Sequence, residues 1–167
     1  MDAKATDYTI VIEGVDLSGK DTLCLKLAEK YGLDFVHFTS HDPKDYSFYS
    51  QSLRKKNVVY SRNWIGEFVY PKFYGRSHSL CLADGFRLVN VSKKNKVKTL
   101  ILTASDEELQ RRLEERGEEQ SCVRDNLSKI NEAFIKLGKR FQIPIVDTSK
   151  TYFEDICSYI ETGRVKW

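Results

Sequence analysis

Several features that would place a chain in a membrane or an export pathway are missing from this sequence. No apolar run approaches the length of about 18 residues that a membrane-spanning helix needs. The first 14 residues, MDAKATDYTIVIEG, carry acidic side chains where a secretory signal has a basic and then an apolar stretch. We therefore expect a cytoplasmic protein that makes no contact with a membrane.

Paired cysteines are also missing. The cysteines Cys24, Cys81, Cys122 and Cys157 are far apart and form no CxxC motif. This spacing predicts free thiols in a reducing compartment and argues against a metal site built from cysteine.

The sequence also lacks a strong net charge and segments of biased composition. The formal net charge of the 167 residues is only +3, and no repeat, linker or low-complexity segment interrupts them. The basic runs 54–57 and 93–98 are typical of solvated loops, although nucleic acid stays open as a partner. With 41% apolar and 31% charged residues, the composition predicts one globular domain over residues 1–167.

What the chain does contain is an alternation of short apolar runs with helical patterns. Five β-rich runs predict buried strands at residues 8–14, 34–38, 57–61, 97–104 and 143–147. Strands separated by helices indicate βαβ units, and therefore a parallel sheet covered by helices on both faces. The stretches 39–57 and 63–80 are less regular and rich in tyrosine, phenylalanine, serine and arginine, which suits a pocket wall.

Helical faces and capping signals fill the intervals between the strands. An apolar stripe predicts a helix over residues 20–31, and a longer stripe runs through Leu127, Ile130, Phe134, Leu137 and Phe141. Two capping boxes mark further helix starts, Ser105 with Glu108 and Thr151 with Glu154.

The segment between the first predicted strand and helix carries the clearest chemistry. Residues 14–20 read G-x-x-x-x-G-K, and this pattern follows a strand and opens a helix. Glycines let backbone N–H groups close around phosphate oxygens, while the helix N-terminus adds partial positive charge. Lys20 is placed to reach the β- and γ-phosphates. Asp16 is either a solvated turn residue or a carboxylate that binds a sugar hydroxyl.

Four segments resemble the P-loop thymidylate kinases and their deoxynucleoside kinase relatives, and together they cover most of the chain. VIEGVDLSGKDTL (11–23) looks like the phosphate loop, with its acid three places into EGxD, and VVYSRNWIGEFVY (58–70) looks like the third strand with the DR motif. LILTASDEELQRRLEERG (100–117) is similar to the fourth strand and the helix leading to an arginine-bearing lid. IPIVDTSKTYFEDICSYI (143–160) is similar to the last strand and helix.

This resemblance implies a three-layer α/β/α P-loop kinase fold with a five-stranded parallel sheet, a lid at about 116–126, and commonly a homodimer. It also implies ATP with Mg²⁺ and phosphoryl transfer to a nucleoside or nucleotide. Transferred by position, the residues expected to bind ATP are Gly14, Leu17, Ser18, Gly19, Lys20, Asp21, Thr22, Arg112, Arg116 and Arg124. Lys20, Asp16 and Arg62 are the expected catalytic residues, with Arg62 on the transferred or acceptor phosphate.

The arginines of the 100–117 segment have a second interpretation. Glu108, Arg112 and Arg116 are four residues apart, so they could form a ladder of charges on a helix surface.

Three positions depart from the family pattern. The hydroxyl that normally follows the loop lysine and binds magnesium is Asp21, and the acid of the DR pair is Ser61. We hypothesise that the two ligands have exchanged places, so that Asp21 and Ser61 together bind Mg²⁺, which prefers hard oxygen ligands. The alternative is that both positions have drifted in a protein without catalytic activity.

The third departure concerns the acceptor. The arginine-proline-glycine segment after the second strand is replaced by HFTSHDPKDYSFY (37–49), whose aromatic residues could stack a base or belong to the core. Arg54 is either an acceptor ligand or a surface charge. The residues expected to bind the acceptor are Asp16, Phe38, Tyr49, Arg62, Glu67, Tyr70 and Arg76. Tyr74 follows the helix expected after Ser61 and Arg62, and is expected to line the same pocket.

These features support three hypotheses. The first is an ATP-dependent kinase of a deoxynucleoside monophosphate, most simply dTMP to dTDP. The second changes the acceptor to a free deoxynucleoside or a modified pyrimidine, including one within DNA. The third is a nucleotide-binding regulatory module without transfer activity, which the unusual Asp21 motivates.

Overall fold

The computed structural model describes residues 7–117 and 121–167, and the side chains of residues 121–124 are not described. Five strands form one sheet: β1 Thr9–Gly14, β2 Asp34–His37, β3 Val58–Ser61, β4 Lys98–Thr103 and β5 Ile145–Asp147. Their order is β2-β3-β1-β4-β5, and each neighbouring pair is parallel. The predicted five-stranded parallel sheet is confirmed, with strand ends that differ from the expected ones by up to two residues.

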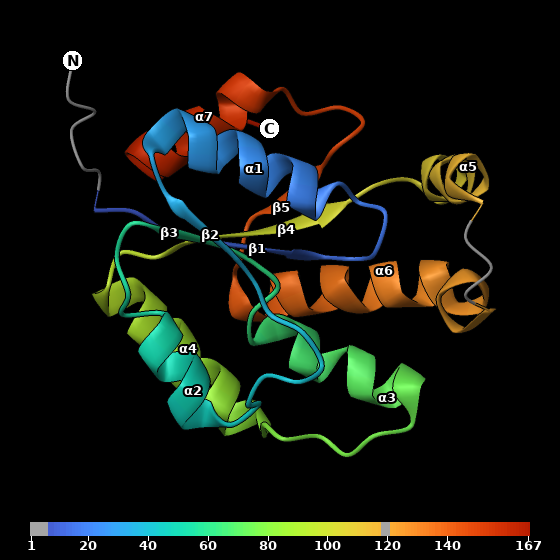
Figure 1. Ribbon diagram of the computed structural model, residues 1–167, viewed down its shortest axis with the longest axis horizontal. Coiled ribbons are helices and arrows are strands. Elements are labelled where there is room, and N and C mark those ends of the chain that lie inside the picture. Colours follow the sequence, from blue (N-terminus) through green and yellow to red (C-terminus); the bar gives the residue numbers. More distant parts are fainter. Residues whose placement is uncertain (1–6, 118–120) are drawn as a thin grey trace.

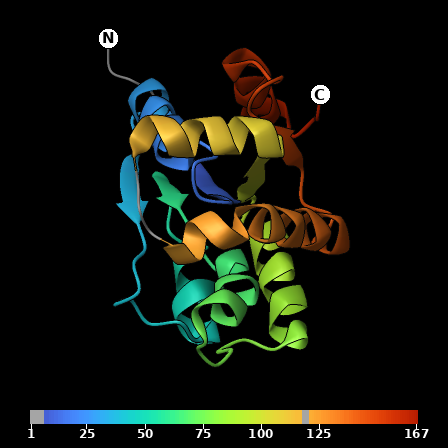
Figure 2. The same cartoon turned by 90° about the vertical axis from the view of Figure 1, so that its right-hand side faces the viewer.

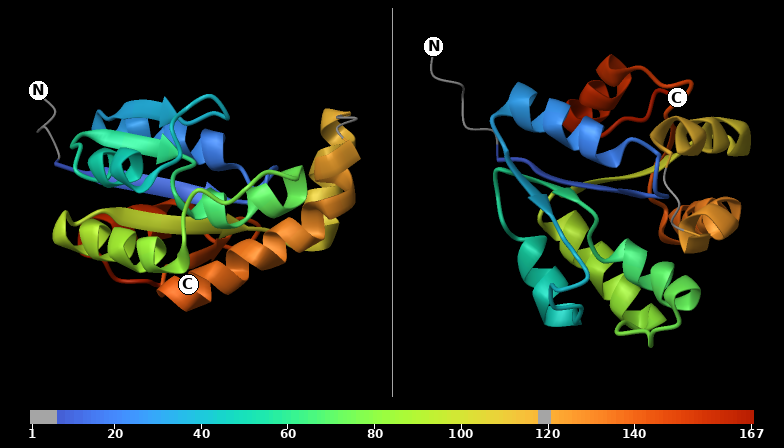
Figure 3. Two further views of the ribbon diagram at one scale, coloured as in Figure 1. Left: turned by 90° about the horizontal axis from the view of Figure 1, so that it is seen from below. Right: turned by 45° about the vertical axis from the view of Figure 1, so that its right-hand side comes forward.

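Helices cover both faces of the sheet (Figure 1). One face carries α1 (Lys20–Tyr31) and α7 (Phe153–Thr162), and the other carries α2 (Tyr46–Ser52), α3 (Tyr70–Tyr74), α4 (Leu82–Lys94) and α6 (Ser121–Phe141). The view from below shows α4 and α6 running under the sheet (Figure 3). This is the predicted three-layer α/β/α arrangement.

The alternation of side chains along β1 explains the two layers of helices. Ile10 and Ile12 pack with the buried residues of α1 and α7, whereas Val11 packs with those of α4 and α6. All six residues of β1 are buried, as expected for a central strand of a parallel sheet. The predicted stripe of α6 is confirmed, because Leu127, Ile130, Phe134 and Phe141 are buried and Leu137 is partly buried.

Of the two predicted capping boxes, the first is confirmed as a helix start but not as a complete box, and the second is not formed. Ser105 accepts a hydrogen bond from the Glu108 amide at 3.2 Å and caps α5 (Asp106–Arg116), although the Glu108 carboxylate binds arginines instead of completing the box. The predicted capping box of Thr151 with Glu154 is wrong. Helix α7 begins one residue later, with Tyr152 at the N-cap and no side-chain cap.

The stretches predicted to be irregular contain short helices. Residues 46–52 form α2, which Asp45 caps by accepting from the Phe48 amide, and residues 65–74 form the 3₁₀ helix η1 (Ile65–Phe68) followed by α3. Each has seven residues or fewer, too short for its sequence alone to specify.

Two remaining expectations concern thiols and membranes. Cys24, Cys81 and Cys157 are free, and the side chain of Cys122 lies outside the described residues. Among the described helices, none combines the length and apolar composition of a bilayer-crossing segment.

Helix α5 marks the end of the molecule where the strands finish. Seen from the carboxyl ends of the strands, α5 crosses in front of the sheet, with the first part of α6 beneath it (Figure 2). The loop from β1 to α1 reaches the same end (Figure 1). In open α/β sheets, ligands bind at this edge.

Candidate active site

The loop between β1 and α1 is shaped by two glycines. Gly14 has φ 136°, and a Cβ there would lie 2.1 Å from the carbonyl oxygen of Leu102, so a side chain is excluded. Gly19 has φ 89° immediately before α1 and places the loop over the helix N-terminus. A cavity of about 820 Å³ opens here, and Asp16 to Leu23 line it.

Lys20 is buried beneath this loop. Its Nζ donates to the carbonyl oxygens of Gly14 at 2.9 Å and Val15 at 2.7 Å. Burial lowers the pKa of the Lys20 ammonium to about 8, and the neighbouring Asp16 carboxylate limits that shift. The ammonium therefore stands at the base of the cavity, held by carbonyl oxygens that a phosphate can replace.

Arg62 links the phosphate loop to the end of β3. Its Nη2 donates to Asp16 Oδ1 at 2.7 Å, and its guanidinium lies 5.5 Å from the centre of the Tyr70 ring. Arg62 itself has φ 70°, a left-handed backbone conformation that is uncommon outside glycine and is typical of constrained sites. The backbone and both neighbours thus aim this cation at the loop.

Asp21 and Ser61 are in contact, as the hypothesis of exchanged ligands requires. Ser61 Oγ donates to Asp21 Oδ1, and His37 Nδ1 lies 3.2 Å from the same oxygen. The pKa of Asp21 lies below its ordinary value: burial opposes this shift, but the Ser61 hydrogen bond and the charge of His37 outweigh it. Asp21 lines the cavity, whereas Ser61 is buried and does not line it, so the Asp21 carboxylate, hydrogen-bonded to the Ser61 hydroxyl, supplies the exposed oxygen that suits Mg²⁺.

Protein groups alone do not complete a metal shell here. Among the described residues, no three or more His, Cys, Asp or Glu side chains gather in a metal-binding cluster. A cation at Asp21 would therefore take most of its ligands from phosphate oxygens and water, as magnesium usually does in nucleotide sites.

Two arginines of α5, Arg112 and Arg116, lie on the far wall of the cavity. Arg112 donates through Nε to Glu108 Oε1 at 2.7 Å and through Nη1 to the Leu17 carbonyl oxygen at 2.9 Å. The Glu108–Arg112 pair of the predicted charge ladder is thus present, yet Arg112 also ties α5 to the phosphate loop. Arg116 lines the same cavity. The side chain of Arg124 and part of the predicted lid at 116–126 lie outside the described residues.

A second cavity of about 470 Å³ adjoins the first. Six of the seven residues expected to bind the acceptor line it: Phe38, Tyr49, Arg62, Glu67, Tyr70 and Arg76. Tyr49 is only 2% exposed, so it belongs to both the core and the wall. The seventh, Asp16, lies in the first cavity.

Glu67 organises the charges of this second cavity. Arg76 donates to both of its carboxylate oxygens, at 2.8 and 3.2 Å, and Lys44 Nζ lies 3.7 Å from Oε1. Arg54 is exposed and lines neither cavity, which favours the surface alternative. Lys44 instead comes from the 37–49 segment that replaces the family's arginine.

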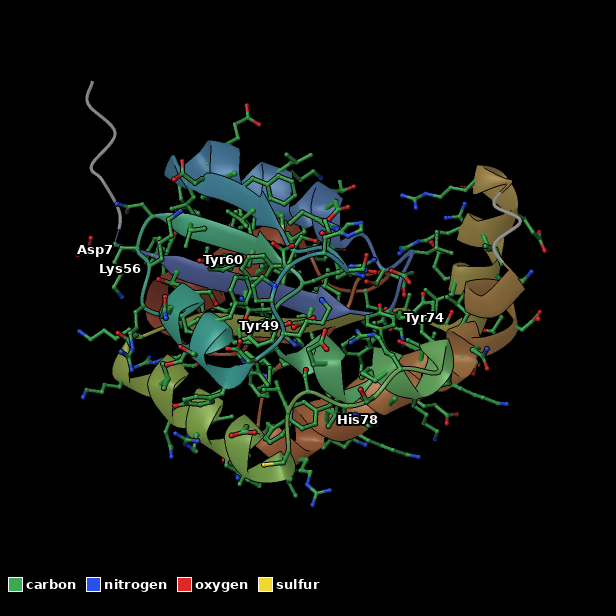
Figure 4. All side chains as sticks on the ribbon, turned by 60° about the horizontal axis from the view of Figure 1, so that its bottom comes forward. Asp7, Tyr49, Lys56, Tyr60, Tyr74 and His78 are labelled. Carbon is green, nitrogen blue, oxygen red and sulfur yellow. The ribbon has the colours of Figure 1, made fainter. Side chains whose placement is uncertain are left out.

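The two cavities meet at three shared side chains, His37, Arg62 and Tyr74. Tyr74 lies at the end of α3 nearest α5, whereas Tyr49 lies further back under the sheet (Figure 4). Sequence reasoning left His37 unassigned and did not single out Lys44. The signal for His37 was its place at the end of a strand, but its contact with Asp21 depends on the strand order.

Glu13, the residue before Gly14, is buried and binds the backbone next to Arg62, where the two cavities meet. One of its carboxylate oxygens accepts from the backbone amides of Asn63 and Ile65, at 2.8 and 2.9 Å. Burial raises the pKa of Glu13 to about 7, although these backbone hydrogen bonds favour its ionised form. The carboxyl group thereby ties β1 to the segment that follows Arg62.

A search by sequence finds neither a family model nor a curated protein that matches this chain. Solved structures with the same fold are found. The YorR protein of Bacillus subtilis, in complex with phosphorylated GDP, superposes with a TM-score of 0.72 and 20% identity over 92% of this chain and 93% of that one.

Two further similar structures are nucleoside and nucleotide kinases. Deoxyadenosine kinase from M. mycoides with bound dATP has a TM-score of 0.60 and 17% identity, over 92% of this chain and 100% of that one. Thymidylate kinase from Candida albicans has a TM-score of 0.59 and 20% identity, over 94% and 92%. At these identities the likeness establishes the fold: the chain has the α/β fold of the P-loop kinases.

Proposed function

We propose that this protein transfers the γ-phosphoryl group of ATP to a deoxynucleoside monophosphate, most simply dTMP to give dTDP. The observation that carries the proposal is the pair of cavities that share Arg62. One is built on the phosphate loop and the other on aromatic and cationic side chains. The junction places a fixed guanidinium where a group passing from one ligand to the other would be.

The larger cavity suits ATP. Backbone amides at the start of α1 and the Lys20 ammonium supply the positive charge that triphosphate needs. Arg112 and Arg116 form the wall where the nucleotide base would lie, and Arg124 and the lid remain predictions. The structures with bound dATP and phosphorylated GDP support a nucleotide in this fold.

Mg²⁺ would be held by Asp21 and Ser61 and would neutralise phosphate charge when bound. The remaining chemistry falls to the chain's own residues. Lys20 and Arg62 stabilise the charge on the transferred group, and Asp16 orients Arg62 and the acceptor's sugar. Phosphoryl transfer depends mainly on such positioning and charge stabilisation.

The charges of the smaller cavity favour a phosphorylated acceptor over a free nucleoside. Among its described lining residues are the cations Lys44, Arg62 and Arg76, against the carboxylate of Glu67. Asp16 pairs with Arg62 from the first cavity, so one cationic charge remains beyond the carboxylates, and it attracts a phosphate of about −2 charge more than a neutral nucleoside. The partly buried Phe38 offers its ring to a base.

Purified protein with ATP and Mg²⁺, offered nucleosides, deoxynucleoside monophosphates and oligonucleotides, tests the proposal through ADP release. We expect ADP with dTMP or another deoxynucleoside monophosphate and none with free nucleosides. Turnover restricted to nucleosides or oligonucleotides would favour the second hypothesis. Tight ATP binding without any acceptor turnover would favour a regulatory module and overturn the proposal.

A further inference from the structure

His37 stands beside the two residues proposed to bind the cation. It is the last residue of β2 and pairs in register with Ser61, the last residue of the neighbouring β3. The two side chains therefore lie at the same edge of the sheet, over the start of α1. Both contact the same atom, Oδ1 of Asp21, which makes that oxygen the centre of the group.

The position is open to a ligand. The side chains of His37 and Asp21 are 35% and 60% exposed, and both residues line the nucleotide-sized cavity. Imidazole nitrogen, carboxylate oxygen and hydroxyl oxygen thus converge beside the phosphate loop from three separate elements.

The chemistry of this donor set differs from that of an all-oxygen site. Magnesium takes oxygen ligands and rarely nitrogen, whereas imidazole binds first-row transition ions more strongly. Imidazole binds a metal ion only in its neutral form, so as a ligand it adds no charge to the protein donors, and the attraction of Asp21 for a dication is kept. The His37 ring therefore favours transition ions over magnesium through the type of its ligand atom, without a change in charge.

We propose that His37 is a direct ligand of the nucleotide-bound cation and that the site prefers a first-row transition dication such as Mn²⁺ over Mg²⁺. The inference rests on the proposed function in that the cation arrives with the nucleotide. It extends that function by assigning a third protein ligand and a metal preference.

Pulsed electron paramagnetic resonance of the protein with Mn²⁺ and ADP tests the ligand directly. A coordinated imidazole couples its nitrogen to the Mn²⁺ electron spin, and labelling only histidine with ¹⁵N changes that signal. We expect the coupling in the wild type and its loss in His37→Gln. His78→Gln is the matched control, because His78 lies on the loop after α3 and lines neither cavity (Figure 4). We expect the nitrogen coupling to persist in this variant.

Nucleotide affinity tests the metal preference without turnover. In calorimetric titrations, ADP should bind the wild type more tightly with Mn²⁺ than with Mg²⁺, and His37→Gln should reduce this ratio about 10-fold. Binding of Mn²⁺ and ADP without nitrogen coupling, or an unchanged ratio in the variant, would overturn the inference and leave the proposed kinase intact. Failure of ADP to bind with either ion would overturn the proposed function as well.

Discussion

At the scale of single residues, substitutions at Asp21 and Ser61 test the hypothesis that these two cation ligands have exchanged places. Asp21→Ser would remove the carboxylate from the pair, and Ser61→Asp would place two carboxylates in contact. Each single variant should lose about 10- to 100-fold in the rate of ADP formation. The double variant restores one carboxylate and one hydroxyl in exchanged positions, so it should regain at least about 10-fold over either single variant.

Circular dichroism of the three variants provides the control, since Ser61 is fully buried and an aspartate there could disturb the sheet. A folded double variant that is no faster than either single variant would contradict the exchange of ligands.

Glu13 supplies a second prediction at this scale, from its pKa of about 7 against an ordinary value of 4.5. Between these pH values the folded protein holds a proton that the unfolded chain has lost, so the free energy of unfolding falls as pH rises. The fall amounts to about 3 kcal/mol between pH 4 and pH 8. Glu13→Gln keeps an acceptor for the Asn63 and Ile65 amides but cannot ionise.

Urea unfolding at pH 4 and pH 8 measures this difference. The wild type should lose stability between the two values by more than Glu13→Gln does. An equal change in both proteins would assign the pH dependence to other groups.

At the scale of elements, the contact between β1 and β4 depends on Gly14. Gly14→Ala would bring a Cβ to 2.1 Å from a backbone oxygen of Leu102, and neither strand can move without breaking the ladder. We expect a loss of more than about 3 kcal/mol in the free energy of unfolding. Fluorescence of the buried Trp64 reports the transition.

Gly32→Ala is the matched control for this substitution. Gly32 ends α1 with φ 64°, but a Cβ there meets nothing within 4 Å, so only the conformational strain of about 1 kcal/mol remains. Equal losses at the two glycines would show that strain, not the close approach of β4, sets the requirement at Gly14.

Elements differ in how far their sequences predict them. The strands and α6 follow from apolar patterns, because the central sheet and a 21-residue amphipathic helix repeat the same signal many times. Helices α2 and α3 are short and depend on tertiary contacts, such as the burial of Tyr49 and Tyr70. Their residues looked like a pocket wall, and they do form one, but their helical state required the rest of the fold.

At the scale of the whole molecule, the same distinction applies to the candidate site. The phosphate loop is contiguous, so its glycines and Lys20 were predicted together with their structural context. His37 and Asp21 are 16 residues apart and meet only because β2 lies beside β3. Lys44 likewise reaches Glu67 through a loop whose path no local pattern specifies. Asp21 and Ser61 also meet through the strand order, but the family resemblance paired them, whereas no motif or resemblance pointed to the contacts of His37 and Lys44.

The assembled cavities lead to a prediction that separates acceptor from donor. Lys44 lines only the smaller cavity, where it faces Glu67 and Arg76. If an acceptor phosphate binds there, Lys44→Met should raise the KM for the monophosphate about 10- to 100-fold, the value of one charged hydrogen bond. The KM for ATP should stay unchanged, since Lys44 contacts Thr39 and Glu67 and does not line the cavity of the phosphate loop. Arg54→Ala removes an exposed cation of the neighbouring helix end and should alter neither constant. Parallel increases in both KM values for Lys44→Met would instead indicate a general electrostatic effect, and the smaller cavity would lose its assignment to the acceptor.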